Sequence, residues 1–144
     1  MLISDVLRGK GNAVKRVRSN ETVADAVRSL SEHRIGALVV EDQRMRMVGI
    51  FSERDFVGAA ARDGAAALSR QVSELMSSVV ITCALSDRVD AMLAKMTVAR
   101  IRHLPVVENG NLVGIVSIGD LVKHRLEEKE LEANVLLDLA RLRP

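Results

Sequence analysis

The sequence contains one unit of structure twice, and this repeat limits the fold more than any other feature. Residues 22–57 align with residues 88–122 at an offset of 66, which becomes 65 in the second half of the alignment. The single change of offset falls in a polar stretch, where turns absorb differences in length. The aligned pairs include Val23 with Val89, Arg34 with Arg100, Leu38 with Leu104, Gly49 with Gly114 and Asp55 with Asp120.

Each copy is expected to contain, in order along the chain, a strand, a helix, two strands and a second helix. The apolar run 37–40 has the length of a buried strand, and apolar residues after Thr22 recur at helical spacing. Asn109 and Gly110 are a strong signal for a tight turn. The first copy has expected strands at 14–17, 37–40 and 47–51 and helices from Thr22 and after the cap 52–55; the second has strands at 79–83, 104–107 and 112–116 and helices from about Ser86 and over 119–126.

This order predicts an α+β fold made of two tandem β-α-β-β-α units with a C-terminal helix. Because units of about 60 residues are marginal alone, we expect them to pack sheet to sheet. The expected divisions are 1–70 for the first unit with the N-terminal segment and linker, 71–126 for the second unit and 127–144 for a helical tail. Within the linker, alanines favour helix and Gly64 interrupts it.

Composition argues against several classes of protein. The chain has 144 residues and a net charge of +2, with two Phe and neither Tyr nor Trp, so it offers no stacking surface or basic stripe for nucleic acid. No apolar run approaches the roughly 18 residues of a membrane span, and the N-terminus lacks the order of a signal peptide. A lone Cys83 fits a reducing cytoplasm.

Enzyme motifs are not evident. The three histidines and Cys83 show no nucleophile–base spacing, and neither a phosphate-binding G-x-x-x-x-G-K-[ST] loop nor H-E-x-x-H occurs. We therefore expect no catalytic activity, no catalytic cofactor and no metal site.

The segments IGALVVED…MVGIFSERDF and IRHLPVVENGNLVGIVSIGDL resemble the two halves of a CBS-domain pair, also called a Bateman module. The resemblance covers residues 3–126 and is most specific at the paired G-φ-x-S-x-x-D segments, 49–55 and 114–120. The chain is similar to stand-alone pairs labelled as related to IMP dehydrogenase, without a catalytic barrel. The resemblance implies a regulatory module that binds adenosine-containing ligands (AMP, ADP, ATP, NAD(H) or S-adenosylmethionine) in the cleft between the two units.

The resemblance assigns the ribose contacts to the two S-x-x-D motifs. It implies that Asp55 and Asp120 hold the ribose hydroxyls, with Ser52 and Ser117 near sugar or phosphate. An isolated S-x-x-D is also an ordinary capping box, in which Ser and Asp satisfy backbone N–H groups at a helix start. The two interpretations are compatible, because a carboxylate at a helix N-terminus can also accept a sugar diol.

The resemblance further implies phosphate contacts at Arg102 and His103, which precede a Leu-Pro pair. A planar guanidinium suits phosphate because it donates two parallel hydrogen bonds. The first copy has Gly36 and Ala37 there, so the two sites should differ, with Arg54 compensating in part. Without the resemblance, Arg102 would be taken for an exposed side chain and His103 for a half-buried one at the start of a strand. Arg54 would be taken for a solvated residue on a helix face.

The resemblance places the adenine edge against the backbone at Pro105, whose carbonyl is expected to be a free acceptor. In the first copy it places the edge against the backbone of Gly36, Ala37 and Leu38. With no Tyr or Trp, the base would lie between aliphatic side chains that could equally be core. The candidates are Val17 or Ile35 in one site and Ile81, Ile101 or Ile115 in the other, with Thr82 as a further contact.

The tail from Leu121 to Arg143 is expected to be one long helix with an apolar stripe through Leu126, Leu131, Val135, Leu139 and Leu142. The stripe packs either on its own chain or against a second copy, and we favour a homodimer. Two functions remain open: a sensor of adenosine nucleotides that passes a conformational change to an unknown partner, or a protein-interaction and dimerisation module with vestigial nucleotide clefts.

Overall fold

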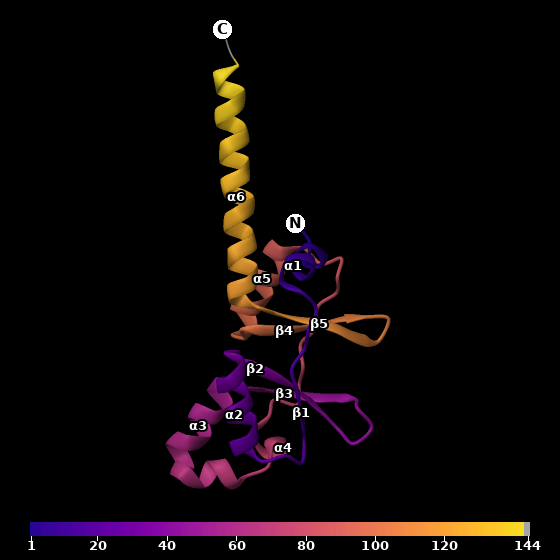
Figure 1. Cartoon of the computed structure of the whole chain (residues 1–144), viewed down its shortest axis with the longest axis vertical. Coiled ribbons are helices and arrows are strands. Elements are labelled where there is room, and N and C mark those ends of the chain that lie inside the picture. Colours follow the sequence, from indigo (N-terminus) through magenta and orange to yellow (C-terminus); the bar gives the residue numbers. More distant parts are fainter. Residues whose placement is uncertain (143–144) are drawn as a thin grey trace. The chain divides into compact units, whose positions relative to one another are not determined.

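The computed structural model describes residues 1–142 and is mixed α and β (Figure 1). It divides into two compact units. The first unit is Ala13–Ile81, and the second unit combines Met1–Asn12 with Thr82–Pro144. The sequence division at residue 70 grouped the N-terminus with the first copy, whereas the structure places it in the unit of the second copy.

The first unit contains a three-stranded sheet in the order β1-β2-β3, with β1 parallel and β3 antiparallel to β2. Helix α3 ends at Asp63 and Gly64 adopts φ 62°, which confirms the interruption expected there. Its elements are β1 (Arg16–Arg18), α2 (Val23–His33), β2 (Ala37–Glu41), β3 (Met47–Ser52), α3 (Glu53–Asp63), the 3-10 helix η1 (Gly64–Ser69) and α4 (Val72–Leu75).

The second unit repeats this plan around an antiparallel pair, β4-β5. Asn109 and Gly110 adopt φ 51° and 79°, which confirms the tight turn between the strands. Its elements are α1 (Ile3–Lys10), α5 (Val89–Ala99), β4 (His103–Glu108), β5 (Asn111–Ser117) and α6 (Ile118–Arg141).

The expected first strand of each copy is shorter in the structure. Val14 lies outside β1, and the strand predicted at 79–83 is wrong: Cys83 makes only an isolated parallel bridge to Val106. This bridge is equivalent, at offset 66, to the pair Val17–Val40 within β1 and β2. An apolar run such as 79–83 gives no register, so its pairing partner decides how much of it becomes a strand.

The repeat also fixes the irregular features of the backbone. Both hairpins shift register at the same place, after Val40 in β2 and after Val106 in β4. Helices α2 and α5 both end on an arginine in the left-handed region, Arg34 at φ 52° and Arg100 at φ 57°. The two copies therefore share backbone irregularities, a bulge and a left-handed helix end, as well as the same pattern of apolar residues.

The core of the first unit lies between the sheet and α2. Val23, Ala26 and Leu30, which were expected on one helix face, are buried against Leu38 and Phe51. At about 25 cal/mol per Å² of apolar surface, this face supplies most of the free energy that holds α2 on its sheet.

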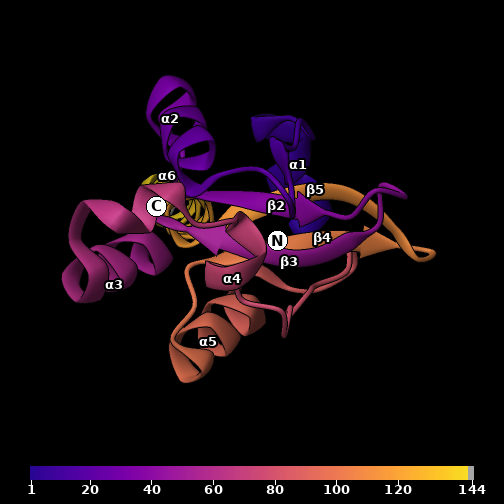
Figure 2. The same ribbon diagram turned by 90° about the horizontal axis from the view of Figure 1, so that it is seen from below.

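Each unit is completed by the segment that precedes the other copy. Helix α1 precedes the first copy but packs on β5 of the second unit, and α4 precedes the second copy but packs on β3 of the first (Figure 2). The backbone bonds match: Ile3 N donates to Asp87 O at 2.9 Å, and Val72 N donates to Glu21 O at 2.9 Å. The two short helices therefore occupy equivalent places.

These contacts need glycine on the facing strand. A Cβ on Gly114 would lie 2.8 Å from Leu7 Cδ1, at the end of a flexible side chain. A Cβ on Gly49 would lie 2.8 Å from Ser77 O, a backbone atom fixed by two hydrogen bonds between Ser77 and Ile50. The atoms that face Gly49 therefore have less freedom to move away from an added Cβ than the atoms that face Gly114.

We expect Gly49→Ala to lower the free energy of unfolding by about 2–3 kcal/mol and Gly114→Ala by about 1 kcal/mol, the range of overpacked cores. Urea unfolding measures both values. Gly58→Ala is the control, because a Cβ there meets only Arg62 Nη1 at 3.6 Å and lies within α3. If Gly49→Ala and Gly114→Ala lowered the free energy of unfolding equally, the result would contradict the rigid packing assigned to Ser77.

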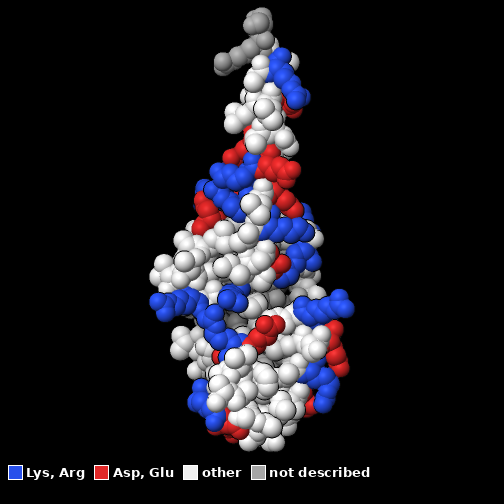
Figure 3. Space-filling model, turned by 90° about the vertical axis from the view of Figure 1, so that its left-hand side faces the viewer, with Lys and Arg blue, Asp and Glu red and all other residues white. Residues whose placement is uncertain are grey.

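Helix α6 extends well beyond the rest of its unit (Figure 1). Leu121 is its buried residue, while the apolar side chains beyond it are exposed. Figure 3 shows charged side chains along the middle of α6 and mostly uncharged surface nearer its C-terminal end. The large exposed apolar residues beyond Leu121 are Val122, Leu126, Leu131, Val135, Leu136, Leu137, Leu139 and Leu142. The long tail helix is thus confirmed as far as Arg141; Arg143, the expected last residue, lies outside the described residues.

Candidate functional site

The capping box of the first unit is present. Asp55 Oδ2 accepts hydrogen bonds from Ser52 N at 2.8 Å and from Ser52 Oγ at 3.1 Å, and Asp55 N donates to Ser52 Oγ at 3.4 Å. Both side chains are half-buried. Because β3 runs directly into α3, this carboxylate is held at the first turn of the helix, with Glu53 and Arg54 beside it.

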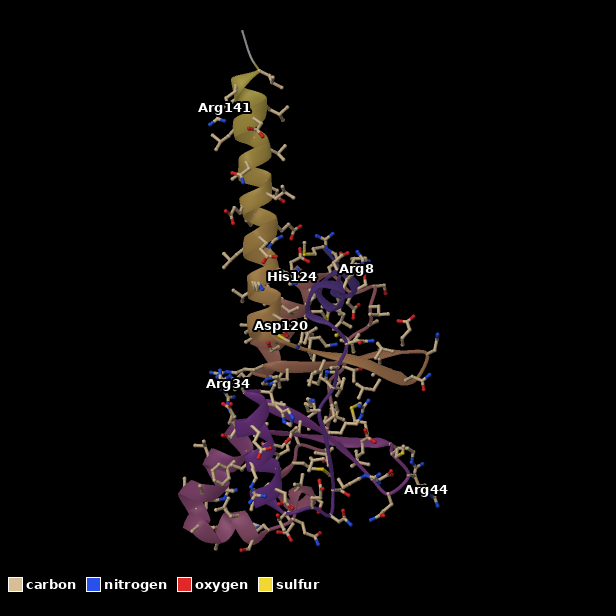
Figure 4. The ribbon with its side chains drawn as sticks, in the orientation of Figure 1. Arg8, Arg34, Arg44, Asp120, His124 and Arg141 are labelled. Atoms are coloured by element: carbon tan, nitrogen blue, oxygen red, sulfur yellow. The ribbon has the colours of Figure 1, made fainter. Side chains whose placement is uncertain are left out.

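The second unit repeats this geometry. Asp120 Oδ2 accepts from Ser117 N at 2.8 Å, and Asp120 N donates to Ser117 Oγ at 3.1 Å. In Figure 4, Asp120 lies at the start of α6 and His124 one turn further along. The structural interpretation of both S-x-x-D motifs is therefore confirmed, and their ligand role stays a prediction.

Lys10, at the end of α1, makes a contact with Asp120 that the sequence did not indicate. Its Nζ donates to Asp120 Oδ2 at 2.5 Å and to Ile115 O at 2.8 Å. The two partners lie 105 and 110 residues away along the chain, so no local pattern relates them. Only the finding that α1 packs on β5 brings this lysine to the site.

The pKa of Asp120 is lowered. Burial is the largest influence and by itself raises the pKa, because it disfavours the charged form. The hydrogen bond and charge of Lys10, together with the Ser117 N–H, outweigh burial. Asp120 is therefore held as a carboxylate with a fixed orientation. A side chain that is to accept hydrogen bonds from hydroxyl groups needs this charged form.

Arg102 and His103 lie next to this helix start. Arg102 O accepts a hydrogen bond from Ile118 N at 2.8 Å, and His103 is the register partner of Ser117. The arrangement in the first unit is equivalent: Gly36 O accepts from Glu53 N at 3.0 Å, and Ala37 is the register partner of Ser52. In each unit, the structure thus brings together the residues before the central strand and the capping box.

One expectation about Pro105 is wrong. Its carbonyl, which was expected to be free, accepts the Cys83 N–H at 3.0 Å, and Val107 N donates to Cys83 O at 2.9 Å. The cause is the bridge between Cys83 and Val106, which uses the backbone on both sides of Val106. Pro105 is itself buried.

The remaining candidates divide between the units. Val17 is buried in the core of the first unit, which supports the view that it is simply a core residue, whereas Ile101, Ile115 and Thr82 are half-buried in the second. Ile115 O is already an acceptor for Lys10, and Thr82 O for Lys95 Nζ at 3.0 Å. Arg54 is exposed on α3.

The described residues near these sites are not arranged for covalent or metal chemistry. Cys83 is buried, and its burial raises the pKa of the thiol to about 11, so the reactive thiolate is disfavoured. His124 Nδ1 is buried without a hydrogen-bond partner among the described residues. Within residues 1–142 no three His, Cys, Asp or Glu side chains are arranged to hold a metal ion.

Comparisons with known proteins agree with the repeat. The CBS domain model matches residues 11–62 and 72–127. "CBS domain-containing protein CBSX3, mitochondrial" of Arabidopsis thaliana is 34% identical over 92% of this chain and 71% of its own length. Within residues 1–142, no helix combines the length and the apolar character that crossing a membrane requires.

Solved structures share the fold. The CBS-domain containing protein ATU1752 from Agrobacterium tumefaciens has a TM-score of 0.84 at 44% identity, covering 86% of this chain and 92% of its own. The CBS domain pair of protein MJ0100, solved in complex with 5′-methylthioadenosine and S-adenosyl-L-methionine, has a TM-score of 0.78 at 27% identity, covering 89% and 98%. The chain belongs to the CBS domain family and is a CBS-domain pair, a regulatory module.

Proposed function

We propose that this chain senses an adenosine-containing ligand and passes the resulting conformational change to a partner protein. The observation that carries the proposal is the carboxylate built twice at a helix start, Asp55 and Asp120, each oriented by its own serine. Lys10 Nζ and Ser117 N both donate to Asp120 Oδ2, and a carboxylate with its two oxygens and about four lone-pair positions can accept further hydrogen bonds from a sugar diol. The pair in MJ0100, with 5′-methylthioadenosine and S-adenosyl-L-methionine, supports this ligand class.

The proposed contacts follow the sequence assignments. In the second unit, Asp120 and Ser117 contact the ribose, Arg102 and His103 a phosphate, and the base lies among Pro105, Thr82, Ile101 and Ile115. In the first unit the corresponding residues are Asp55, Ser52, Arg54, Gly36, Ala37 and Val17. AMP, ADP, ATP and NAD(H) are the other ligands in the proposal, acting as regulators and not as catalytic cofactors, and a reducing cytoplasm is the proposed location.

Ligand-dependent thermal stability tests the proposal. The panel consists of AMP, ADP, ATP, NAD, NADH, S-adenosylmethionine and 5′-methylthioadenosine. A ligand present at 100 times its Kd adds about 2.7 kcal/mol to the stability of the folded state, which raises Tm by roughly 5–10 °C in a domain of this size. GTP is the control, because it carries the same phosphates and ribose on another base. No shift with any adenosine compound would contradict the sensor.

The ligand acts on a partner only through its preference for one arrangement of the protein. The tail of α6 is the proposed route of assembly, because seven apolar side chains between Leu126 and Leu142 are exposed there. Isolated exposed leucines are common on protein surfaces, whereas a contiguous set indicates an interface. Leu131, Val135, Leu139 and Leu142 follow one another at spacings of four, four and three residues, so these four form one apolar face of the helix. We propose that the occupant of this face is a second copy of the chain, which forms a homodimer. The same observation favours the alternative of a dimerisation module without nucleotide binding.

A further inference from the structure

The contact of Lys10 with the second capping box distinguishes two sites that are otherwise copies. Lys10 Nζ lies between Asp120 Oδ2 and Ile115 O, and the side chains of Lys10 and Asp120 are only 30% and 26% exposed. Two acceptors and limited exposure hold this ammonium in place. A charge-assisted hydrogen bond of this kind is stronger than an ion pair between freely solvated side chains.

The first unit fills the equivalent position differently. Ile50 O, which corresponds to Ile115 O at offset 65, accepts the backbone N–H of Ser77 at 2.8 Å. The reason is that α4 ends at Leu75 and the chain then runs extended beside β3, whereas α1 continues as a helix to Lys10. One carbonyl is therefore satisfied by a neutral backbone donor and the other by a cation that also reaches the capping carboxylate.

The local charge of the two helix starts differs as a result. Glu53, Arg54 and Asp55 at the start of α3 carry a formal charge of −1. Asp120 with Lys10 is neutral, and Arg102, whose carbonyl is bonded to the first residue of α6, makes the second site +1. A 5′-phosphate is on the same ribose as the diol and so within a Debye length, about 10 Å, of the carboxylate that binds the diol. An uncompensated Asp would repel it.

We propose that Lys10 determines the ligand class of the Asp120 site: it selects an adenosine ligand with an anionic 5′ group, a phosphorylated nucleoside, over an uncharged or cationic one. This inference rests on the proposed function. Lys10 cancels the charge of Asp120 through Oδ2, and a carboxylate can accept more hydrogen bonds than the ones from Lys10 and Ser117. The Asp55 site, which lacks this lysine, is suited to an adenosine ligand without phosphate.

Calorimetric titration with AMP and with uncharged 5′-methylthioadenosine tests the inference. The titrations use the full chain carrying Asp55→Asn, which silences the first site and retains an acceptor for Ser52 N. We expect this protein to prefer AMP. Adding Lys10→Gln, which keeps an N–H donor for Ile115 O, weakens AMP about tenfold, the effect of losing one charge interaction, and changes 5′-methylthioadenosine less than about twofold. Lys10→Arg retains AMP binding.

The control is Lys123→Gln, an exposed lysine of α6 that changes the net charge equally and leaves both affinities as they were. Equal loss of both ligands in Lys10→Gln overturns the inference, because Lys10 would then only support the shape of the site. A gain in AMP affinity also overturns it, because Lys10 would then compete with the ligand for Asp120. If the Asp55→Asn protein with Lys10 intact prefers 5′-methylthioadenosine to AMP, the inference is also overturned, and this result does not depend on the Lys10→Gln variant. Binding of neither ligand by the unmodified chain overturns the proposed function, and this inference with it.

Discussion

Asp120→Ala is expected to weaken nucleotide binding at least about 100-fold, and more than Asp55→Ala does. A carboxylate that accepts both ribose hydroxyls makes two hydrogen bonds to a charged group, each contributing about 1.5–3 kcal/mol, and every 1.4 kcal/mol is a factor of ten in Kd. The second site loses more because Arg102, His103 and Lys10 lie around it, whereas the first has Gly36 and Ala37. Calorimetric titration with AMP measures both variants.

Two further variants separate binding from folding. Asp120→Asn keeps an oxygen for the Ser117 N–H and should retain the helix cap while losing the charge. Asp138→Ala removes a carboxylate from the exposed part of α6, where its partner is Arg141 at 3.8 Å, and should leave AMP binding unchanged. Equal or reversed effects of Asp55→Ala and Asp120→Ala would refute the ranking of the two sites.

Removal of residues 127–144 is expected to convert a homodimer into a monomer while preserving nucleotide binding. Burying a leucine contributes about 1.5–3 kcal/mol, so losing only two of the exposed leucines from the interface weakens the dimer at least about 100-fold. Light scattering coupled to size-exclusion chromatography gives the mass of each species. The truncation also removes Glu128, which pairs with Arg125 and the N-terminal amine.

A double substitution tests the tail without that loss. Leu131→Glu with Leu139→Glu changes two side chains that are 65% and 55% exposed and so leaves the core intact. Lys129→Ala with Glu132→Ala, which removes an ion pair from the same helix, is the matched control and should remain dimeric. A truncated chain that stays dimeric would place the interface elsewhere. A truncated chain that binds no nucleotide, when the intact chain also binds none, would favour the interaction module.

Local signals accounted for much of the fold. The apolar run at 37–40 became β2, Asn109 and Gly110 formed the expected turn, and Ser52 and Ser117 cap helices as their motifs indicated. In each case a few adjacent residues determine the outcome through sterics, burial or a single hydrogen bond. Because the same signals occur twice at a fixed offset, each copy supported the interpretation of the other.

Features that depend on distant pairing could not be predicted. The placement of α1 in the second unit depends on Leu7 meeting Gly114, and the Lys10–Asp120 contact follows from that placement. Cys83 forms one bridge where a strand was predicted, and this bridge occupies the Pro105 carbonyl that was expected to be free. Periodicity reports which face of an element is buried and says nothing about which distant segment covers it.

The central claim is that the carboxylate at the start of α6 binds the sugar of an adenosine nucleotide. The most direct test is a crystal structure of the intact chain grown with AMP. The claim predicts both ribose hydroxyls within about 2.5–3.0 Å of the Asp120 carboxylate. A nucleotide bound away from Asp120 and Asp55, or both carboxylates facing only solvent at saturating AMP, would contradict it.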